Sequence, residues 1–64
     1  MKNRLRELRE EKELSQKKLA VMLNMSQTGY SKYETGENDI PTKILIKLAE
    51  IYDVSVGYIL GVED

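Results

Sequence analysis

The residues best suited to chemistry lie between positions 27 and 32. They carry amide, hydroxyl and ammonium groups at the spacing of one helical face: Gln27, Thr28, Ser31 and Lys32. A Gln amide can pair with N6 and N7 of adenine, and a Lys ammonium can donate to guanine O6 or N7. A Thr methyl can contact the thymine methyl. This set therefore predicts a helix face that contacts base edges in the major groove of duplex DNA.

Gly29 stands in the middle of the same segment. A Gly inside a helix costs about 1 kcal/mol relative to Ala, so its presence needs a reason. The missing side chain would let the helix approach a base edge closely, and we count Gly29 with Gln27, Thr28 and Lys32 as candidate base contacts. The alternative interpretation is that these are ordinary polar surface residues of a helix hairpin.

Two short helices must position these side chains. Ser15 can cap the first, expected over about residues 16–23, and Asn24 tolerates the left-handed conformation that ends a helix. Ser26 can cap the second, expected over about residues 27–34. Only about three residues turn the corner between them, which forces a steep crossing angle. The stretch therefore predicts a helix-turn-helix, whose second helix can enter a major groove.

Further short motifs follow in the same register. From first to last they span about fifty of the 64 residues: Leu14-Ser15-Gln16, Leu19-Ala20, Leu23, Ser26, Ser31-Lys32-Tyr33-Glu34, Gly36, Lys47-Leu48-Ala49, Val54-Ser55-Val56 and Tyr58-Ile59-Leu60-Gly61. This ordered set resembles the Cro and phage-repressor family of helix-turn-helix proteins, often called the Xre family. The resemblance implies an all-α, lambda-repressor-like fold of five helices and sequence-specific DNA binding, usually as a dimer.

The resemblance also implies roles for single residues. Gln16 would anchor the start of its helix to a DNA phosphate, aided by the helix dipole. Arg9 would form a buried ion pair with Glu34, although a local pair with Glu13 or plain solvation is the alternative. The acidic residues Glu37 and Asp39 stand where family members often carry basic ones, which argues for few phosphate contacts there. The further candidates for contact with the DNA backbone are Lys17, Ser26, Ser31, Asn38 and Lys43.

The rest of the chain supplies supporting helices. Asn3 can cap a first helix ending near Lys12, and Pro41 can open a fourth helix. Glu13 and Asp53 stand where the family usually has Gly. We expect a strained or widened corner at Glu13, whereas the short side chain of Asp53 is a tolerable replacement. The predicted core is aliphatic: Leu5, Leu8, Leu19, Leu23, Leu45, Leu48, Val54, Val56, Ile59 and Leu60. Residues 1–64 are expected to form a single domain.

The last helix, expected over residues 56–60, has more apolar surface than one small core needs. In the resemblance this region is a frequent dimer contact. An aromatic ring with a polar tip suits a partly wet interface. The residues expected at a homodimer interface are Ile51, Tyr58 and Ile59.

Charge is unevenly distributed along the chain, although the net charge is only −1. Residues 1–32 hold eight Lys and Arg against four Glu, a balance of +4. Residues 33–64 hold two Lys against seven Asp and Glu, a balance of −5. DNA binding requires local positive potential and not a basic whole. The first half is therefore the one expected to face the duplex.

Composition excludes several classes of function. There is no Cys and no His, and no nucleophile–base pair or metal set can be assembled, so we expect neither an enzyme nor a cofactor. No apolar run approaches the roughly 20 residues of a membrane span, and a cytoplasmic protein is expected. The sequence favours a dimeric repressor that binds a double-stranded operator. The alternative is an antitoxin-like module whose main partner is another protein.

Overall fold

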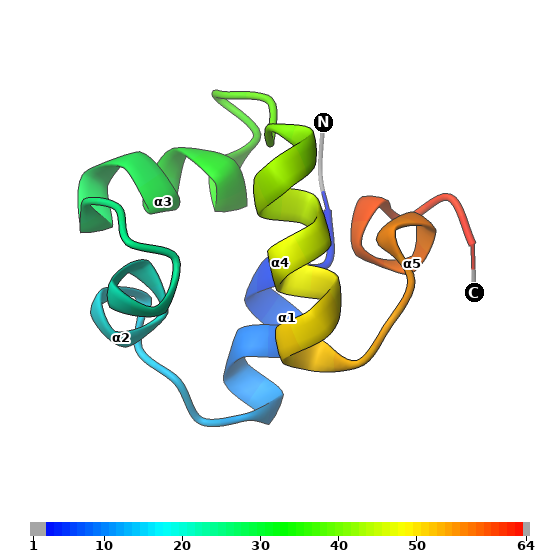
Figure 1. Cartoon of the computed structure of the whole chain (residues 1–64), viewed down its shortest axis with the longest axis horizontal. Helices are drawn as coiled ribbons and strands as arrows, with labels where there is room; N and C mark the ends of the chain where they lie inside the picture. Colours follow the sequence, from blue (N-terminus) through cyan, green and yellow to red (C-terminus); the bar gives the residue numbers. More distant parts are fainter. Residues whose placement is uncertain (1–2, 64) are drawn as a thin grey trace.

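The computed structural model describes residues 3–63, which form five helices and no strand (Figure 1). They are α1 (Leu5–Glu11), α2 (Gln16–Met22), α3 (Gln27–Thr35), α4 (Thr42–Tyr52) and α5 (Val56–Leu60). The prediction of an all-α, five-helix fold is confirmed. The second helix ends one residue earlier than expected, at Met22, and the third ends one residue later, at Thr35.

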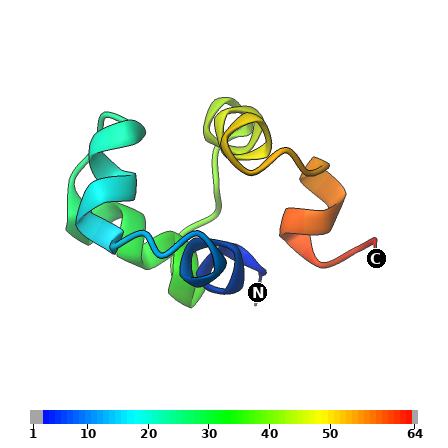
Figure 2. The ribbon, with the colours of Figure 1, turned by 90° about the horizontal axis from the view of Figure 1, so that it is seen from below.

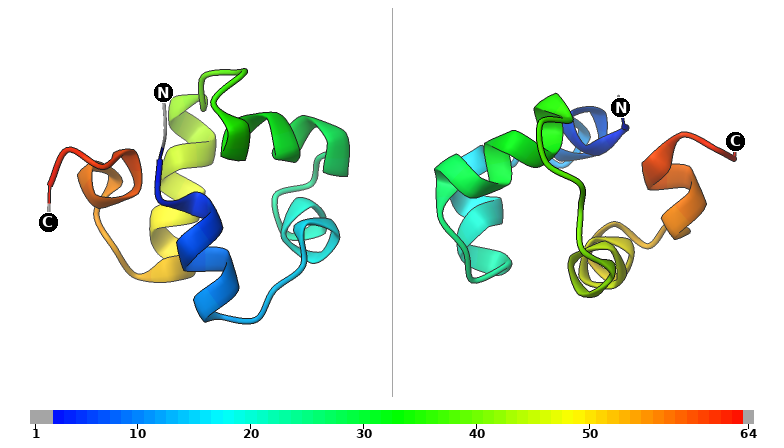
Figure 3. Two further views of the ribbon diagram at one scale, coloured as in Figure 1. Left: turned by 180° about the vertical axis from the view of Figure 1, so that it is seen from behind. Right: turned by 90° about the horizontal axis from the view of Figure 1, so that it is seen from above.

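The molecule measures 28 × 23 × 19 Å along its three principal axes. The helices follow one another along the longest of these axes. In every view α2 and α3 cross at one end, α1 and α4 lie in the middle, and α5 lies at the other end (Figures 1, 2 and 3). The steep α2–α3 crossing is therefore held against a central pair of helices, and α5 is remote from it.

Serine hydroxyls cap three of the helices, and the caps at Ser15 and Ser26 are the ones that the sequence predicts. The Oγ atoms of Ser15, Ser26 and Ser55 each accept a hydrogen bond, at 3.0 Å, from the backbone N–H three residues later. Asn3 acts differently, because it lies one residue before the cap position of α1. Its Oδ1 atom accepts a hydrogen bond from the Leu5 N–H at 3.1 Å. These bonds satisfy donors that the first turn of a helix leaves unpaired.

Three corners use a left-handed residue that is not Gly. The φ angles of Glu13, Asn24 and Asp53 are 55°, 58° and 55°. The short side chains of Asn24 and Asp53 tolerate this conformation, whereas at Glu13 it costs roughly 1–2 kcal/mol. The strain expected at the α1–α2 corner is thus present in the backbone.

The core is less aliphatic than predicted. Leu5, Leu19, Leu48 and Ile59 are fully buried, but so is Tyr30, and Tyr52 is nearly so. Leu45 and Val54 pack only partly buried against this core, and Val56 and Leu60 are likewise half-buried. The reason is the shortness of α5, which has five residues and can turn only Ile59 fully inward. Two tyrosine rings occupy the volume assigned to smaller side chains.

Candidate nucleic-acid interface

The outer face of α3 forms one shallow groove with the start of α2. Its lining residues are all polar: Gln16, Gln27, Thr28, Ser31, Lys32, Thr35 and Glu37. Gln27, Thr28 and Lys32 are exposed, and Ser31 is half-exposed. The structure therefore brings together the side chains that the sequence assigned to base contact, with Gln16 beside them.

The inner face of α3 fixes the direction of this outer face. Tyr30 is fully buried and meets the ring of Tyr33 edge-on, with centroids 6.4 Å apart and planes at 87°. At the turn, the backbone N–H of Met25 donates to the carbonyl of Ala20 at 3.0 Å. Residues 23–26 thus connect the two helices rigidly, and α3 cannot rotate about its axis without exposing Tyr30.

Close packing around residue 29 leaves little room for a side chain. A Cβ atom built there would lie 3.1 Å from Ser26 Oγ and 3.2 Å from Met25 Cε. Both contacts are on the side of the α2–α3 turn, where Ser26 Oγ accepts from the Gly29 N–H. Gly29 therefore accommodates the cap and the Met25 side chain; its role as a base contact stays a prediction.

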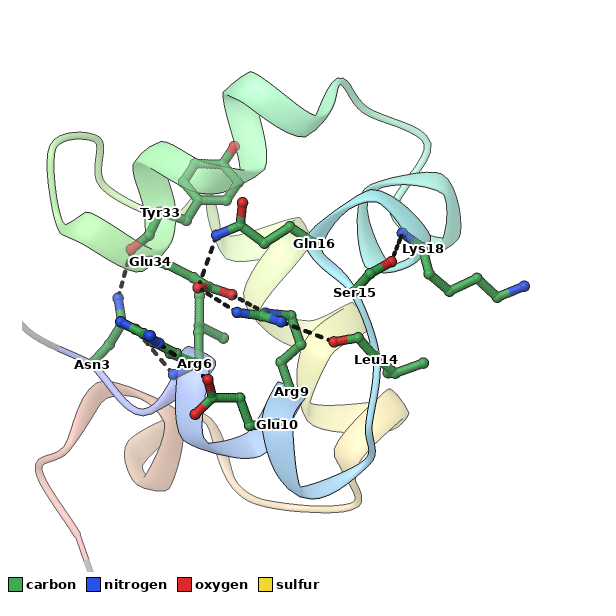
Figure 4. A network of polar contacts seen from close by, with 11 residues as sticks. Asn3, Arg6, Arg9, Glu10, Leu14, Ser15, Gln16, Lys18, Tyr33 and Glu34 are labelled. Carbon is green, nitrogen blue, oxygen red and sulfur yellow. Dashed lines mark hydrogen bonds and ion pairs between the residues drawn. The ribbon is translucent and has the colours of Figure 1, made fainter.

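Arg9 joins α1 to the end of α3, as Figure 4 shows. Its Nε donates to Glu34 Oε2 at 2.7 Å, its Nη2 donates to Glu34 Oε1 at 3.3 Å, and its Nη1 donates to the Leu14 carbonyl at 2.9 Å. The two charged side chains are only 13% and 5% exposed. A bidentate pair of this kind is among the stronger hydrogen-bonded contacts in proteins. The structure thus places Arg9 against Glu34 and not against Glu13.

Electrostatics at this pair favour the charged forms. Burial opposes ionisation of the Glu34 carboxyl, but its hydrogen bonds, led by the one from Arg9, lower its pKa below the ordinary value of 4.5. The hydrogen bond to Glu34 in turn raises the pKa of Arg9. The buried hydroxyl of Tyr52 has no hydrogen-bond partner within residues 3–63, and it lies near enough to Glu34 and Arg9 for their charges to act on its pKa. Burial raises the pKa of Tyr52 to about 12.

A helix-turn-helix family model matches residues 5–59, which is most of the chain. The match includes every helix of the described structure except the last residue of α5. The chain belongs to the Xre family of helix-turn-helix DNA-binding proteins. The resemblance inferred from the sequence motifs is confirmed.

Similar proteins are named as transcriptional regulators. The uncharacterized regulator YobD of Bacillus subtilis is 41% identical over 95% of this chain and 54% of its own length. The regulator ImmR of the same organism is 38% identical over 95% of this chain and 48% of its own length. A putative regulatory protein of Pyrococcus furiosus is 44% identical over 78% of this chain and 16% of its own length. The chain thus spans about half the length of the Bacillus relatives.

Gln16 lies between the Arg9–Glu34 ion pair and the outer face of α3. Its Nε2 donates to Glu34 Oε1 at 3.1 Å (Figure 4), a bond that sequence reasoning missed. Gln16 also lines both the α3 groove and a neighbouring hollow that contains Arg9 and Glu34. The hydrogen bond to Glu34 therefore fixes the orientation of the Gln16 amide, and the same side chain borders the α3 groove.

The other candidates for backbone contact are more dispersed. Lys17 is exposed beside Gln16, and Ser26 already uses its Oγ as an acceptor for the α3 cap. Asn38 lines a separate hollow with Asp39 and Ile40, and Lys43 is exposed at the start of α4. Neither Asn38 nor Lys43 lines the α3 groove. Their contact with DNA stays a prediction.

The expected dimer residues must be corrected at one position. Ile59 is fully buried in the core, so its side chain cannot form part of an interface between copies. Ile51 and Tyr58 are half-buried. The Tyr58 ring stacks on the Arg4 guanidinium, 4.3 Å from the ring centroid, and Arg4 Nη1 also donates to the carbonyls of Tyr58 and Glu63 at 3.1 and 2.6 Å. Tyr58 is thus held at the surface, whereas Ile59 belongs to the monomer.

No helix within residues 3–63 has the length and apolar character needed to cross a membrane. In the same part of the chain no three acidic side chains gather as a metal site would require.

Proposed function

We propose that this chain is the DNA-binding part of a transcriptional regulator that binds a double-stranded operator as a dimer and represses by occluding a promoter. In this proposal α3 lies in the major groove, with Gln27, Thr28 and Lys32 at base edges. Gln16 and Lys17 bind the phosphate backbone at the start of α2.

The observation that carries the proposal is the α3 groove. Its polar side chains are exposed on a helix whose opposite face is anchored by the buried Tyr30. A recognition surface must be exposed yet rigid, since base contacts add specificity only when their geometry is fixed in advance. Membership of the Xre family supports the same conclusion.

The positions of α3 and α5 support a dimer. They lie toward opposite ends of a molecule 28 Å long (Figure 1). Two copies that meet at their α5 ends would carry their α3 helices outward. In this proposal each α3 helix occupies one of two half-sites that lie one DNA turn apart, about 34 Å. Tyr58 and Ile51 are the residues proposed for this contact.

Selection of bound sequences from a random duplex library tests the proposal. We expect one enriched sequence with two related half-sites, bound with an affinity that falls as salt rises because phosphate contacts release counterions. No enrichment, together with no salt-sensitive binding, would contradict the proposal. Capture of one stoichiometric protein in that case would favour the antitoxin-like alternative.

A further inference from the structure

The α3 groove contains a carboxylate that the proposed DNA contacts do not use. Glu37 is exposed and is the one acidic residue among the groove's lining side chains. Residues 3–63 form two ion pairs, Arg6–Glu10 and Arg9–Glu34. No Lys or Arg of these residues therefore lies within 4.0 Å of the Glu37 carboxylate. Its negative charge is not neutralised from within the described part of the chain.

The backbone holds Glu37 at this place. Gly36 ends α3 with a φ of 82°, which turns the chain back over the last helical turn. The Glu37 N–H then donates to Thr35 Oγ1 at 3.4 Å, and the Asn38 N–H donates to the carbonyl of Lys32 at 3.2 Å. Glu37 is therefore attached to the end of α3 and would approach the duplex together with it.

A carboxylate can accept hydrogen bonds but cannot donate them. Phosphates, guanine O6 and N7, and thymine O4 are acceptors as well, so all of these repel it. The major groove offers amino donors on cytosine N4 and adenine N6, and Glu is a suitable acceptor for cytosine N4. An unpaired carboxylate on a surface that meets DNA therefore favours a base that carries an amino group and disfavours the others.

Building on the proposed function, we infer that Glu37 is a specificity-determining residue that accepts a hydrogen bond from the N4 amino group of a cytosine in the operator. It contributes discrimination more than affinity, because an approach to a guanine or thymine edge leaves a charge without a partner. Asp39, two residues further on, is exposed and acidic but lines a different hollow. Asp39 therefore supplies a control of equal charge.

The test uses the full chain and the site it selects from the random library. Parent, Glu37→Ala and Asp39→Ala are titrated by fluorescence anisotropy against that site, each of its single-base variants and a random duplex. For Glu37→Ala we expect one position, cytosine in the selected site, to lose about 5- to 150-fold of discrimination, with random DNA bound no more weakly than by the parent. Asp39→Ala should keep the parent's preference at every position.

Two results would overturn the inference. One is that Glu37→Ala keeps all of the parent's base preferences. The other is that it changes every affinity by the same factor as Asp39→Ala, which would mean that its charge acts only at long range. Both leave the proposed function intact, since the parent still selects a site. A parent that selects no site at all removes the proposed function and the inference together. Thermal unfolding by circular dichroism establishes that the variants are folded.

Discussion

Arg9 and Glu34 are 25 residues apart in sequence, and their side chains join the first helix to the last turn of α3 through two hydrogen bonds. The Glu34 carboxylate also accepts from Gln16 at the start of α2. One carboxylate thus connects three helices (Figure 4). The orientation of α3 depends on a charged group that is almost entirely removed from solvent.

Removal of Arg9 should therefore be costly. Arg9→Ala leaves the Glu34 charge buried without its main partner, and we expect a loss of about 3–5 kcal/mol in the free energy of unfolding. Arg6→Ala is the matched control, because Arg6 pairs with Glu10 on the exposed surface of the same helix and should cost less than about 0.5 kcal/mol. Urea denaturation measures both. A loss below 0.5 kcal/mol for Arg9→Ala would show that the pair does not hold the fold.

Stability should fall in acid because of Glu34. A carboxyl whose folded-state pKa is lowered stabilises the fold above its ordinary pKa of 4.5, and this contribution is lost as the pH falls through the folded-state value. Glu34→Gln should be less stable at pH 7 and should show a smaller further loss between pH 5 and pH 3. Urea denaturation across that range gives the two slopes. Equal slopes in parent and variant would be inconsistent with a lowered pKa at Glu34.

Tyr52→Phe should stabilise the protein. The Tyr52 hydroxyl is buried and has no hydrogen-bond partner within the described residues, and a buried unpaired polar group costs about 1–3 kcal/mol. Removal of that one oxygen leaves the ring packing in place, so a gain of about 1 kcal/mol is expected. A rise in the denaturation midpoint at constant slope measures it. A loss of stability would indicate that the hydroxyl has a partner, such as an internal water.

Two variants separate base contact from phosphate contact. Lys32→Ala should weaken binding to the selected operator by about 1–3 kcal/mol and relax the preference at one base pair. Gln16→Ala should weaken specific and random DNA about equally. Equal losses on both DNAs for both variants would contradict the base contact assigned to Lys32.

Cooperative binding should depend on Tyr58. Tyr58→Asp places a charge at the proposed contact between copies, so binding to two half-sites should lose its cooperativity while binding to one half-site persists. Ile46→Asp is the control, since Ile46 is 52% exposed on α4 and takes no part in the proposed contact. Titration of one-site and two-site duplexes distinguishes them. Undiminished cooperativity in Tyr58→Asp would place the contact elsewhere.

The parts of the fold that follow local rules could be predicted from the sequence. Ser15 and Ser26 cap α2 and α3, and Asn24 adopts a left-handed conformation. These features could be predicted because each depends on residues only a few positions away.

The rest depends on distances between elements, which spacing along the chain does not encode. Nothing in the motif around Gln16 indicates that its amide meets Glu34, since that bond exists only after α2 and α3 have crossed. Likewise, nothing in the spacing around Gly29 indicates that the Met25 side chain occupies the space beside it. Ile59 is predicted both in the core and at the dimer contact, and the structure keeps only the core assignment, because the five-residue helix α5 buries it completely.

The separation of α3 and α5 has an evolutionary consequence. Under the proposed function, substitutions on the outer face of α3 change which bases are bound, and substitutions around Tyr58 change how two copies are spaced. No residue of the α3 groove belongs to α5, so neither kind of change has to be compensated by the other. Descendants of such a protein can acquire a new operator while keeping their partner, and paralogues in one cell can lose the ability to pair while still competing for the same site.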